Sequence, residues 1–236
     1  MSPVPALVIP DVEAWNDAFA REHDIDDYYA RSGFLIGWIE QRRLACIRRF
    51  VDARSNQRIL EVGCGGGHVL RLFPGCELTG VDVSGEMLAK ARRKLKGYSA
   101  RLLKGELHEL NLPDAGFDKV ICSEVLEHVV DPEAVLTEIR RLVRPGGRVV
   151  VTVPNDHLVN HLKRIVRDSG LTFLPPFRRI SWGGDHYHLH VWSVAQMREL
   201  LSRDFSVLRA RFAPGRWLPV RCCFLCTPSQ RRHRAG

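Results

Sequence analysis

Three glycines at alternate positions stand between two apolar segments of the chain. Gly63, Gly65 and Gly67 follow the apolar run 58–62, and the next apolar run ends at Asp82. In an α/β sheet this order brings a glycine turn and an acid together at the carboxyl ends of adjacent strands, where nucleotides bind. Glycine lets the backbone approach a ligand closely and adopt positive φ. Asp82 stands near the spacing at which an acid meets a ribose hydroxyl, so the pattern predicts a nucleotide-binding crevice.

A second set of polar residues follows the apolar run 117–123. Glu124, Glu127 and His128 form the pattern Glu-x-x-Glu-His. Two carboxylates and an imidazole can bind a divalent cation, and an imidazole can also act as a general base near neutral pH. We expect His128 to line the pocket as a candidate base, and we expect no bound metal.

Three more histidines, His186, His188 and His190, occupy alternate positions between Gly183 and Ser193. Alternate side chains of an extended segment point to the same side, so these histidines can face one pocket. His186 and His188 are further candidate bases, and we expect at least two of the three to be structural. Because no cysteine lies nearby and the spacing fits no usual zinc pattern, we do not expect a zinc site.

Alternating strands and helices position these residues. The sequence predicts strands over 58–62, 77–82, 100–104, 117–123 and 147–153, with helices over 67–73, 85–96 and 131–143. This alternation indicates a parallel sheet with helices on both faces. Beyond Pro154 the sequence predicts, in order, a helix over 157–169, an irregular stretch, a helix from Ser193 to about residue 202, and a hairpin of strands 205–212 and 220–227.

The glycine motif carries a family resemblance. Glu61-x-Gly63-x-Gly65-x-Gly67 resembles motif I of the class I S-adenosylmethionine-dependent methyltransferases, whereas a dinucleotide fingerprint would require glycine where His68 stands. The segment 117–129, Arg144-Pro145-Gly146-Gly147 and the segment 151–155 extend the resemblance, above all to the ubiquinone-biosynthesis O-methyltransferases. The resemblance implies a Rossmann-like, seven-stranded, mostly parallel sheet with an antiparallel last strand and an N-terminal helical cap.

The resemblance also implies the sites that hold the cofactor, S-adenosylmethionine. Glu61 belongs to the motif whose glycines, Gly63, Gly65 and Gly67, would cradle the methionine part. Asp82 would accept hydrogen bonds from both ribose hydroxyls.

The remaining implied contacts surround the adenine and the carboxylate of the cofactor. Val83 would pack on the adenine, and Glu106 with Leu107 would meet its amino edge and ring. Ser123 would lie under the methionine part. Arg43 would bind the carboxylate, because a guanidinium can meet a carboxylate with two hydrogen bonds.

We expect three regions along the chain. Residues 1–52 form the helical cap, residues 53–227 form the methyltransferase domain, and residues 228–236 form a disordered tail. Within the domain, residues 155–192 are expected to form an insert over the substrate pocket.

Composition sets the expected environment. The chain has 45% hydrophobic residues, and no apolar run reaches the length of a membrane span. We see no signal peptide, and seven cysteines in a chain of 236 residues favour a reducing compartment, so we expect a cytoplasmic protein. Cys223 and Cys226 lie in an apolar run and are expected to be core residues.

The expected reaction is methyl transfer to a small-molecule acceptor, at oxygen. Two alternatives stay open, a nucleic-acid methyltransferase and a protein that binds S-adenosylmethionine without catalysis. The net charge of +8 and the basic second half of the chain would suit nucleic acid, but no Asn-Pro-Pro-Tyr motif is present, so we expect no nucleic-acid partner. The absence of a Tyr-x-x-x-Lys arrangement disfavours a nicotinamide dehydrogenase.

Residues 157–182 support a further hypothesis. Apolar residues alternate there with Lys163, Arg164 and Arg167, as in helices that lie on anionic membranes. Peripheral association with an anionic membrane and a lipophilic acceptor would fit this pattern, and so would a helical lid over the substrate pocket. The acceptor, the atom methylated and the oligomeric state are not determined by the sequence.

Overall fold

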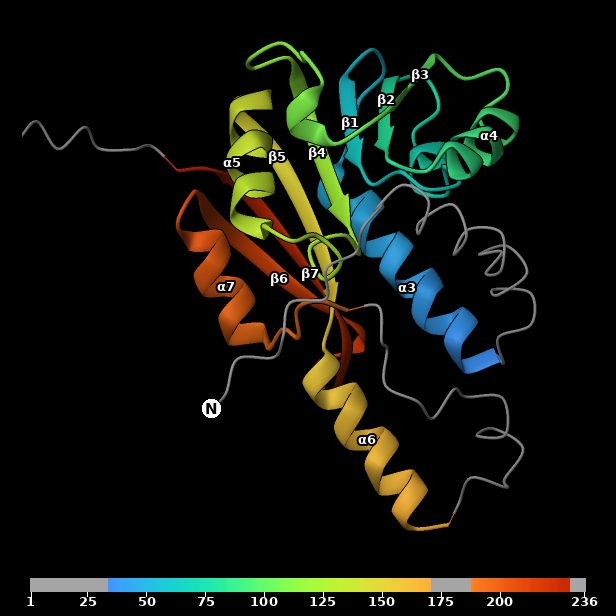
Figure 1. Cartoon of the computed structure of the whole chain (residues 1–236), viewed down its shortest axis with the longest axis vertical. Helices are drawn as coiled ribbons and strands as arrows, with labels where there is room; N and C mark the ends of the chain where they lie inside the picture. The colour runs from blue at the N-terminus through green and yellow to red at the C-terminus, as the bar shows by residue number, and fades with distance from the viewer. Residues whose placement is uncertain (1–33, 171–187, 230–236) are drawn as a thin grey trace, which may run out of the picture.

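A seven-stranded sheet forms the centre of the structure (Figure 1), a computed structural model that describes residues 34–170 and 188–229. Its strand order is β3-β2-β1-β4-β5-β7-β6. Strands β1 to β5 pair parallel with one another, and β7 pairs antiparallel with both β5 and β6. The predicted mostly parallel sheet with an antiparallel strand near its end is confirmed. The strands are β1 Arg58–Val62, β2 Glu77–Asp82, β3 Ala100–Lys104, β4 Phe117–Ser123, β5 Val143–Pro154, β6 Phe205–Gly215 and β7 Leu218–Pro228.

Helices cover both faces of this sheet. Their bounds are α3 Phe34–Val51, α4 Gly85–Lys94, α5 Pro132–Leu142, α6 Asp156–Asp168 and α7 Val194–Ser202, with short 3₁₀ helices η1 Leu70–Leu72 and η2 Leu107–Glu109. Side-chain caps begin several of them. Ser84 accepts a hydrogen bond from the Met87 amide, Asp131 from the Ala134 amide, and Ser193 from the Gln196 amide. Each cap satisfies an amide that lacks a partner within its helix.

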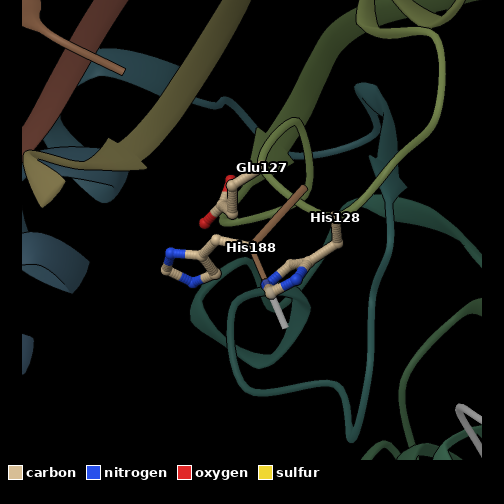
Figure 2. Close-up of side chains that lie close together, drawn as sticks. All are labelled: Glu127, His128 and His188. Atoms are coloured by element: carbon tan, nitrogen blue, oxygen red, sulfur yellow. The ribbon is translucent and has the colours of Figure 1, made fainter. Parts of the chain in front are cut away.

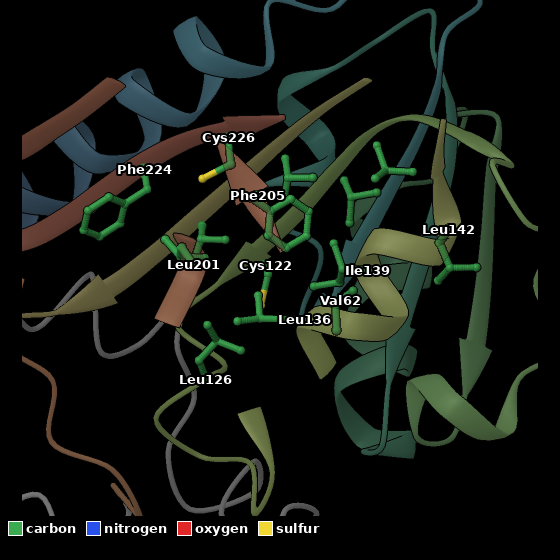
Figure 3. Packing of buried hydrophobic residues seen from close by; sticks show 14 of the residues in the cluster. Val62, Cys122, Leu126, Leu136, Ile139, Leu142, Leu201, Phe205, Phe224 and Cys226 are labelled. Atoms are coloured by element: carbon green, nitrogen blue, oxygen red, sulfur yellow. The ribbon is translucent and has the colours of Figure 1, made fainter. Parts of the chain in front are cut away.

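Two apolar cores lie on opposite faces of the sheet, because successive strand residues point to opposite sides. In β5, Val149 and Val151 belong to the core beneath α5 and α7, while Val150 belongs to the core beneath α3, η1 and α4. Figure 3 shows the first core, with Leu136 and Ile139 of α5 packed among strand residues. Cys222, Cys223 and Cys226 are buried between the strands and helices, as predicted for core residues.

Several elements differ from their predicted bounds. The predicted helix 67–73 contains only the single turn η1, because Pro74 follows at once and disfavours helical backbone before it. Strand β5 begins at Val143, four residues before the predicted start, because Phe117 pairs with Val143 ahead of an irregularity in the register. The turn between β6 and β7 lies at residues 216 and 217, just after Pro214-Gly215.

The predicted helical cap is described only from residue 34, where α3 begins. Helix α6 matches the predicted helix 157–169 and extends away from the sheet (Figure 1). Among residues 34–170 and 188–229, no helix has the length and apolar character that crossing a membrane requires.

Candidate active site

The glycine turn after β1 is built from backbone conformations that favour glycine. Gly63, Gly65 and Gly67 have φ angles of +64°, +47° and +77°. A Cβ on Gly63 would overlap Val125 Cγ2, and a Cβ on Gly67 would approach Leu95 closely. A Cβ on Gly65, by contrast, would meet nothing within 4 Å. The turn is therefore packed on two sides and open at Gly65, the shape of a cradle that can receive a ligand.

Asp82 closes one side of this cradle from the end of β2. Its Oδ2 accepts a hydrogen bond from the Gly65 amide at 2.7 Å, and its Oδ1 accepts one from the Ser84 amide at 2.9 Å. These bonds fix the carboxylate beside the open glycine, and a carboxylate oxygen has a second lone pair that can accept from a hydroxyl. The structure thus brings together Gly65 and Asp82, as predicted, at the carboxyl ends of β1 and β2.

Glu61 lies beneath the turn and is only 2% exposed. Its Oε2 has no hydrogen-bond partner among the described residues. Burial raises the pKa of this carboxyl well above its usual range; Arg43 opposes the shift and Asp82 adds to it. A buried carboxyl oxygen without a hydrogen-bond partner, next to the open glycine turn, is consistent with a binding site for a polar ligand.

Arg43 and Ser123, both predicted to contact the cofactor, lie in contact with each other. Arg43 is buried in α3, and its Nη1 donates to Ser123 Oγ at the end of β4. Its Nε donates to Glu40 Oε2 at 2.7 Å. The guanidinium is thus held at the carboxyl end of β4, close to the glycine turn in the sheet order.

Further hydrogen bonds close this contact into a ring. Ser123 Oγ lies 2.9 Å from Thr152 Oγ1, which donates to Glu124 Oε1 at 2.9 Å. Arg221 Nε lies 3.1 Å from Glu124 Oε2 and 3.4 Å from Glu40 Oε1. The ring joins α3, β5 and β7 to the segment after β4. It therefore holds these four parts of the chain together at the carboxyl end of β4.

The residues predicted around the adenine take different positions. Val83 is half-buried after β2, and Leu107 is buried in the core beneath α5. Glu106 is exposed next to η2, with its amide bonded to Glu109 Oε2. Their contact with adenine stays a prediction.

A histidine and an aspartate pair on the other side of β4. His188 Nδ1 lies 3.1 Å from Asp156 Oδ2, and both side chains are largely buried, at 15% and 5% exposed. Leu189 and His190 donate their amides to the Glu127 carbonyl at 2.8 and 3.2 Å, which ties this segment to the turn after β4. Because a carboxylate can only accept, this contact favours the tautomer with the proton on Nδ1, in which Nε2 is the acceptor.

Two further residues that the sequence singled out, Glu127 and His128, lie near His188 (Figure 2). The rings of His128 and His188 meet edge to face, with centroids 4.9 Å apart. Glu127 is buried, and its Oε2 has no partner within the described part of the chain. Burial raises the pKa of Glu127 well above its usual range, and Glu124 adds to the shift.

Ligand atoms of Glu127, His128 and His188 lie within 4.8 Å of one another, so these residues could hold a divalent cation. This set differs from the alternative that the sequence offered, Glu124, Glu127 and His128, because Glu124 contacts Thr152 and Arg221 instead. The expectation that no metal is bound stays a prediction.

The remaining candidate histidines have separate outcomes. His190 Nε2 lies 3.0 Å from the Val129 carbonyl, the contact of a structural histidine. His186 lies outside the described residues.

Sequence reasoning missed four residues of the site, namely Glu40, Thr152, Asp156 and Arg221. Thr152 gave a signal, because it is a polar residue within the apolar strand β5. Asp156 stands two residues after β5, at the edge where active sites form in such sheets. Glu40 and Arg221 are charged residues next to apolar runs, a pattern too common to single them out.

Known proteins resemble this chain in sequence. A family model described as a methyltransferase domain matches residues 60–151. The ubiquinone biosynthesis O-methyltransferase of Aeromonas salmonicida is 39% identical over 162 residues, which cover 64% of this chain and 65% of that enzyme. The phosphatidylethanolamine N-methyltransferase of Cereibacter sphaeroides is 39% identical over 153 residues, which cover 63% of this chain and 70% of the relative. The chain spans less than two thirds of the length of several ubiquinone relatives that it matches.

Solved structures share the fold. The N-methyltransferase NodS from Bradyrhizobium japonicum, in complex with S-adenosyl-L-homocysteine, has a TM-score of 0.60 at 18% identity, covering 81% of this chain and 88% of that one. The matched residues 60–151 include the glycine turn, Asp82 and Ser123. Sequence relatives, sheet order and the open glycine cradle agree, and the chain belongs to the class I S-adenosylmethionine-dependent methyltransferase family.

Proposed function

We propose that this protein transfers a methyl group from S-adenosylmethionine to a hydroxyl of a small-molecule acceptor. The observation that carries the proposal is the glycine turn, open only at Gly65, with Asp82 fixed beside it. Gly63, Gly65 and Gly67 would hold the methionine part of the cofactor, and Asp82 its ribose. Arg43, supported by Ser123, would bind its carboxylate.

The bound cofactor supplies a methyl carbon that is already activated by the positively charged sulfur. The acceptor oxygen would bond to that carbon as the carbon–sulfur bond breaks, and the electron pair of the broken bond would stay on the sulfur of S-adenosylhomocysteine, the second product. The hydroxyl proton must leave the acceptor, and we assign it to His188 Nε2. Asp156 is a positioning residue, because its carboxylate orients the ring and stabilises the imidazolium that forms. Alignment of the acceptor against the methyl group contributes much of the remaining rate.

An amine acceptor is the second candidate. The N-methyltransferase of Cereibacter sphaeroides is 39% identical to this chain, which covers 70% of it. An amine also loses a proton during methyl transfer, so the pair of His188 and Asp156 suits both acceptors. The names of both relatives refer to lipophilic molecules, ubiquinone and phosphatidylethanolamine, and this supports a lipophilic acceptor.

Calorimetric titration with S-adenosylmethionine and S-adenosylhomocysteine tests the cofactor site. We expect micromolar binding by wild type, and loss of binding in Asp82→Ala. Glu77→Ala is the matched control, because Glu77 is an exposed acid at the opposite end of the same strand. No binding by wild type would refute the proposal.

A panel of catechols, simple phenols and primary amines, with methyl-labelled cofactor, then tests the chemistry. We expect His188→Gln to lower the methyl-transfer rate about 100-fold or more, with cofactor affinity unchanged, and Asp156→Asn to have a smaller effect in the same direction. His190→Gln is the control, because His190 bonds a backbone carbonyl. Loss of activity with a chelator, restored by a divalent cation, would instead assign Glu127, His128 and His188 to a metal.

A further inference from the structure

A cavity with a strongly positive lining lies between α3 and the edge strand β6. Its volume is about 690 Å³, within the range of pockets that hold small molecules. Cys46 of α3 and Phe212 of β6 form part of its wall. Five of its lining residues are arginines, namely Arg42, Arg49, Arg198, Arg211 and Arg216.

No acidic residue is among those that line the cavity. None of the five arginines forms an ion pair with an acid in residues 34–170 or 188–229. Several arginines elsewhere in the described chain do so, as Arg144 does with Asp118 at 2.6 Å and Arg148 with Asp52 at 3.0 Å. Like charges brought together without a counter-charge repel one another, and a bound anion would relieve this repulsion.

An adjoining hollow extends the positive surface. It has a volume of about 320 Å³, shares Arg49 with the cavity, and adds Arg148 and Arg209. Asp52 is its one acid, and its carboxylate already accepts from Arg148 Nη1. The positive charge therefore extends beyond the cavity along β6.

We propose that the cavity binds a phosphate-bearing small molecule, at a site separate from the cofactor and acceptor sites. Guanidinium groups bind phosphate through paired hydrogen bonds as well as charge, and several around one hollow suit a group with more than one negative charge. The phosphate can belong to a soluble phosphate ester or to an anionic lipid headgroup. This inference does not depend on the proposed reaction.

Cys46 provides a reporter inside the cavity. It is half-buried, and the other six cysteines of the chain are buried. Its hydrogen bond with Cys223 lowers the pKa of the Cys46 thiol; burial opposes this, and the charges of Arg211 and Arg49 lower the pKa further. A thiolate is the reactive form of cysteine, so a thiol reagent should label Cys46 first, and a bound anion should shield it.

The test measures labelling of Cys46 in the full chain by a neutral maleimide, with mass spectrometry to identify the modified residue. Inorganic pyrophosphate is the soluble probe. Arg49→Gln/Arg211→Gln removes two charges from the cavity. Its matched control, Arg92→Gln/Arg101→Gln, removes two exposed charges on α4 and β3, at the opposite edge of the sheet. Because Arg49 and Arg211 also affect the thiol, each variant is judged by its ratio of rates with and without pyrophosphate.

We expect pyrophosphate to slow labelling of the wild type and of the control variant severalfold. The cavity variant should need about tenfold more pyrophosphate for half-protection, because hydrogen bonds to charged groups are lost. Added salt should weaken protection, as for any exposed charge interaction.

Vesicles of phosphatidylcholine, with and without phosphatidylglycerol, distinguish the two sources. Protection by the anionic vesicles would indicate a lipid headgroup, and protection by pyrophosphate alone would indicate a soluble phosphate ester. Equal weakening in both double variants would indicate a general charge effect and overturn the proposal. Protection by none of the probes would also overturn it.

Discussion

Replacing Gly65 with alanine should change the stability of the fold and the affinity for the cofactor by different amounts, and the geometry of the glycine turn allows both to be estimated. Gly65 has a φ of +47°, which costs an L-residue about 1–2 kcal/mol. The added Cβ meets no protein atom within 4 Å, so no steric term is added to that cost. The methyl group would instead occupy the open space that we assign to the cofactor. We therefore expect a loss of stability of about 1–2 kcal/mol and a loss of S-adenosylmethionine affinity of about tenfold or more.

Gly63→Ala is the matched comparison within the same turn. Its φ of +64° carries the same backbone cost, but its Cβ would overlap Val125 Cγ2. Overpacking of this kind adds about 1–3 kcal/mol, so Gly63→Ala should be the less stable variant. Val125→Ala in the same chain should recover the steric part and leave the backbone part.

Urea unfolding gives the stability of each variant, and calorimetry gives its cofactor affinity. Wild-type affinity in Gly65→Ala would show that the open space is not where the cofactor lies. Equal destabilisation by the two alanine substitutions would show that Val125 does not pack against the turn as described. Either result would refute the reasoning from the cradle's shape.

Three other predictions concern Arg43, Glu61 and helix α6. Arg43→Lys should weaken binding of S-adenosylhomocysteine about tenfold, because a charged paired contact is lost, but should leave 5′-methylthioadenosine unaffected, since that nucleoside lacks the carboxylate; equal weakening of both ligands would place Arg43 elsewhere. Glu61 has a raised pKa in the folded protein, so the folded state holds its proton above the unfolded value of about 4.5 and stability falls as pH rises from there. Glu61→Gln should flatten this fall in urea unfolding between about pH 5 and 8, and an unchanged slope would contradict the assignment. Helix α6 exposes Ile165 by 51%, and we expect co-sedimentation with anionic vesicles at low salt that Ile165→Asp reduces; no co-sedimentation by wild type would exclude the membrane hypothesis.

Local sequence predicted the strands on either side of the glycine turn well, because strand and turn signals are local. The strands 58–62 and 77–82 match β1 and β2 to the residue, since each is an apolar run with clear turn residues beyond it. Parallel strands then bring their carboxyl ends together, and this is why the sequence predicts Asp82 beside the glycine turn. Strand β5 was less well predicted, because its first residues include glycines and follow a helix directly.

The proposed acceptor side could not be predicted in the same way. His188 and Asp156 are 32 residues apart, and Arg221 is 181 residues from Glu40. No local signal selects these partners, because tertiary packing brings their elements together. The histidine pattern predicted a candidate base near residue 188. Only the contact with Asp156 distinguishes His188 from the neighbouring histidines.

One short segment after β4 joins both halves of the site. Ser123 contacts Arg43 on the proposed cofactor side, and Glu127 holds the His188 segment on the other side through its carbonyl. Between them Glu124 has a φ of +56°, a conformation that costs a residue other than glycine about 1 kcal/mol or more. Its amide donates to the Thr152 carbonyl, and its carboxylate accepts from the Thr152 hydroxyl and pairs with Arg221, and these contacts offset that cost. Because the reversed backbone at Glu124 sets how the chain continues from Ser123 to Glu127, we infer that this residue fixes the relative position of cofactor and acceptor.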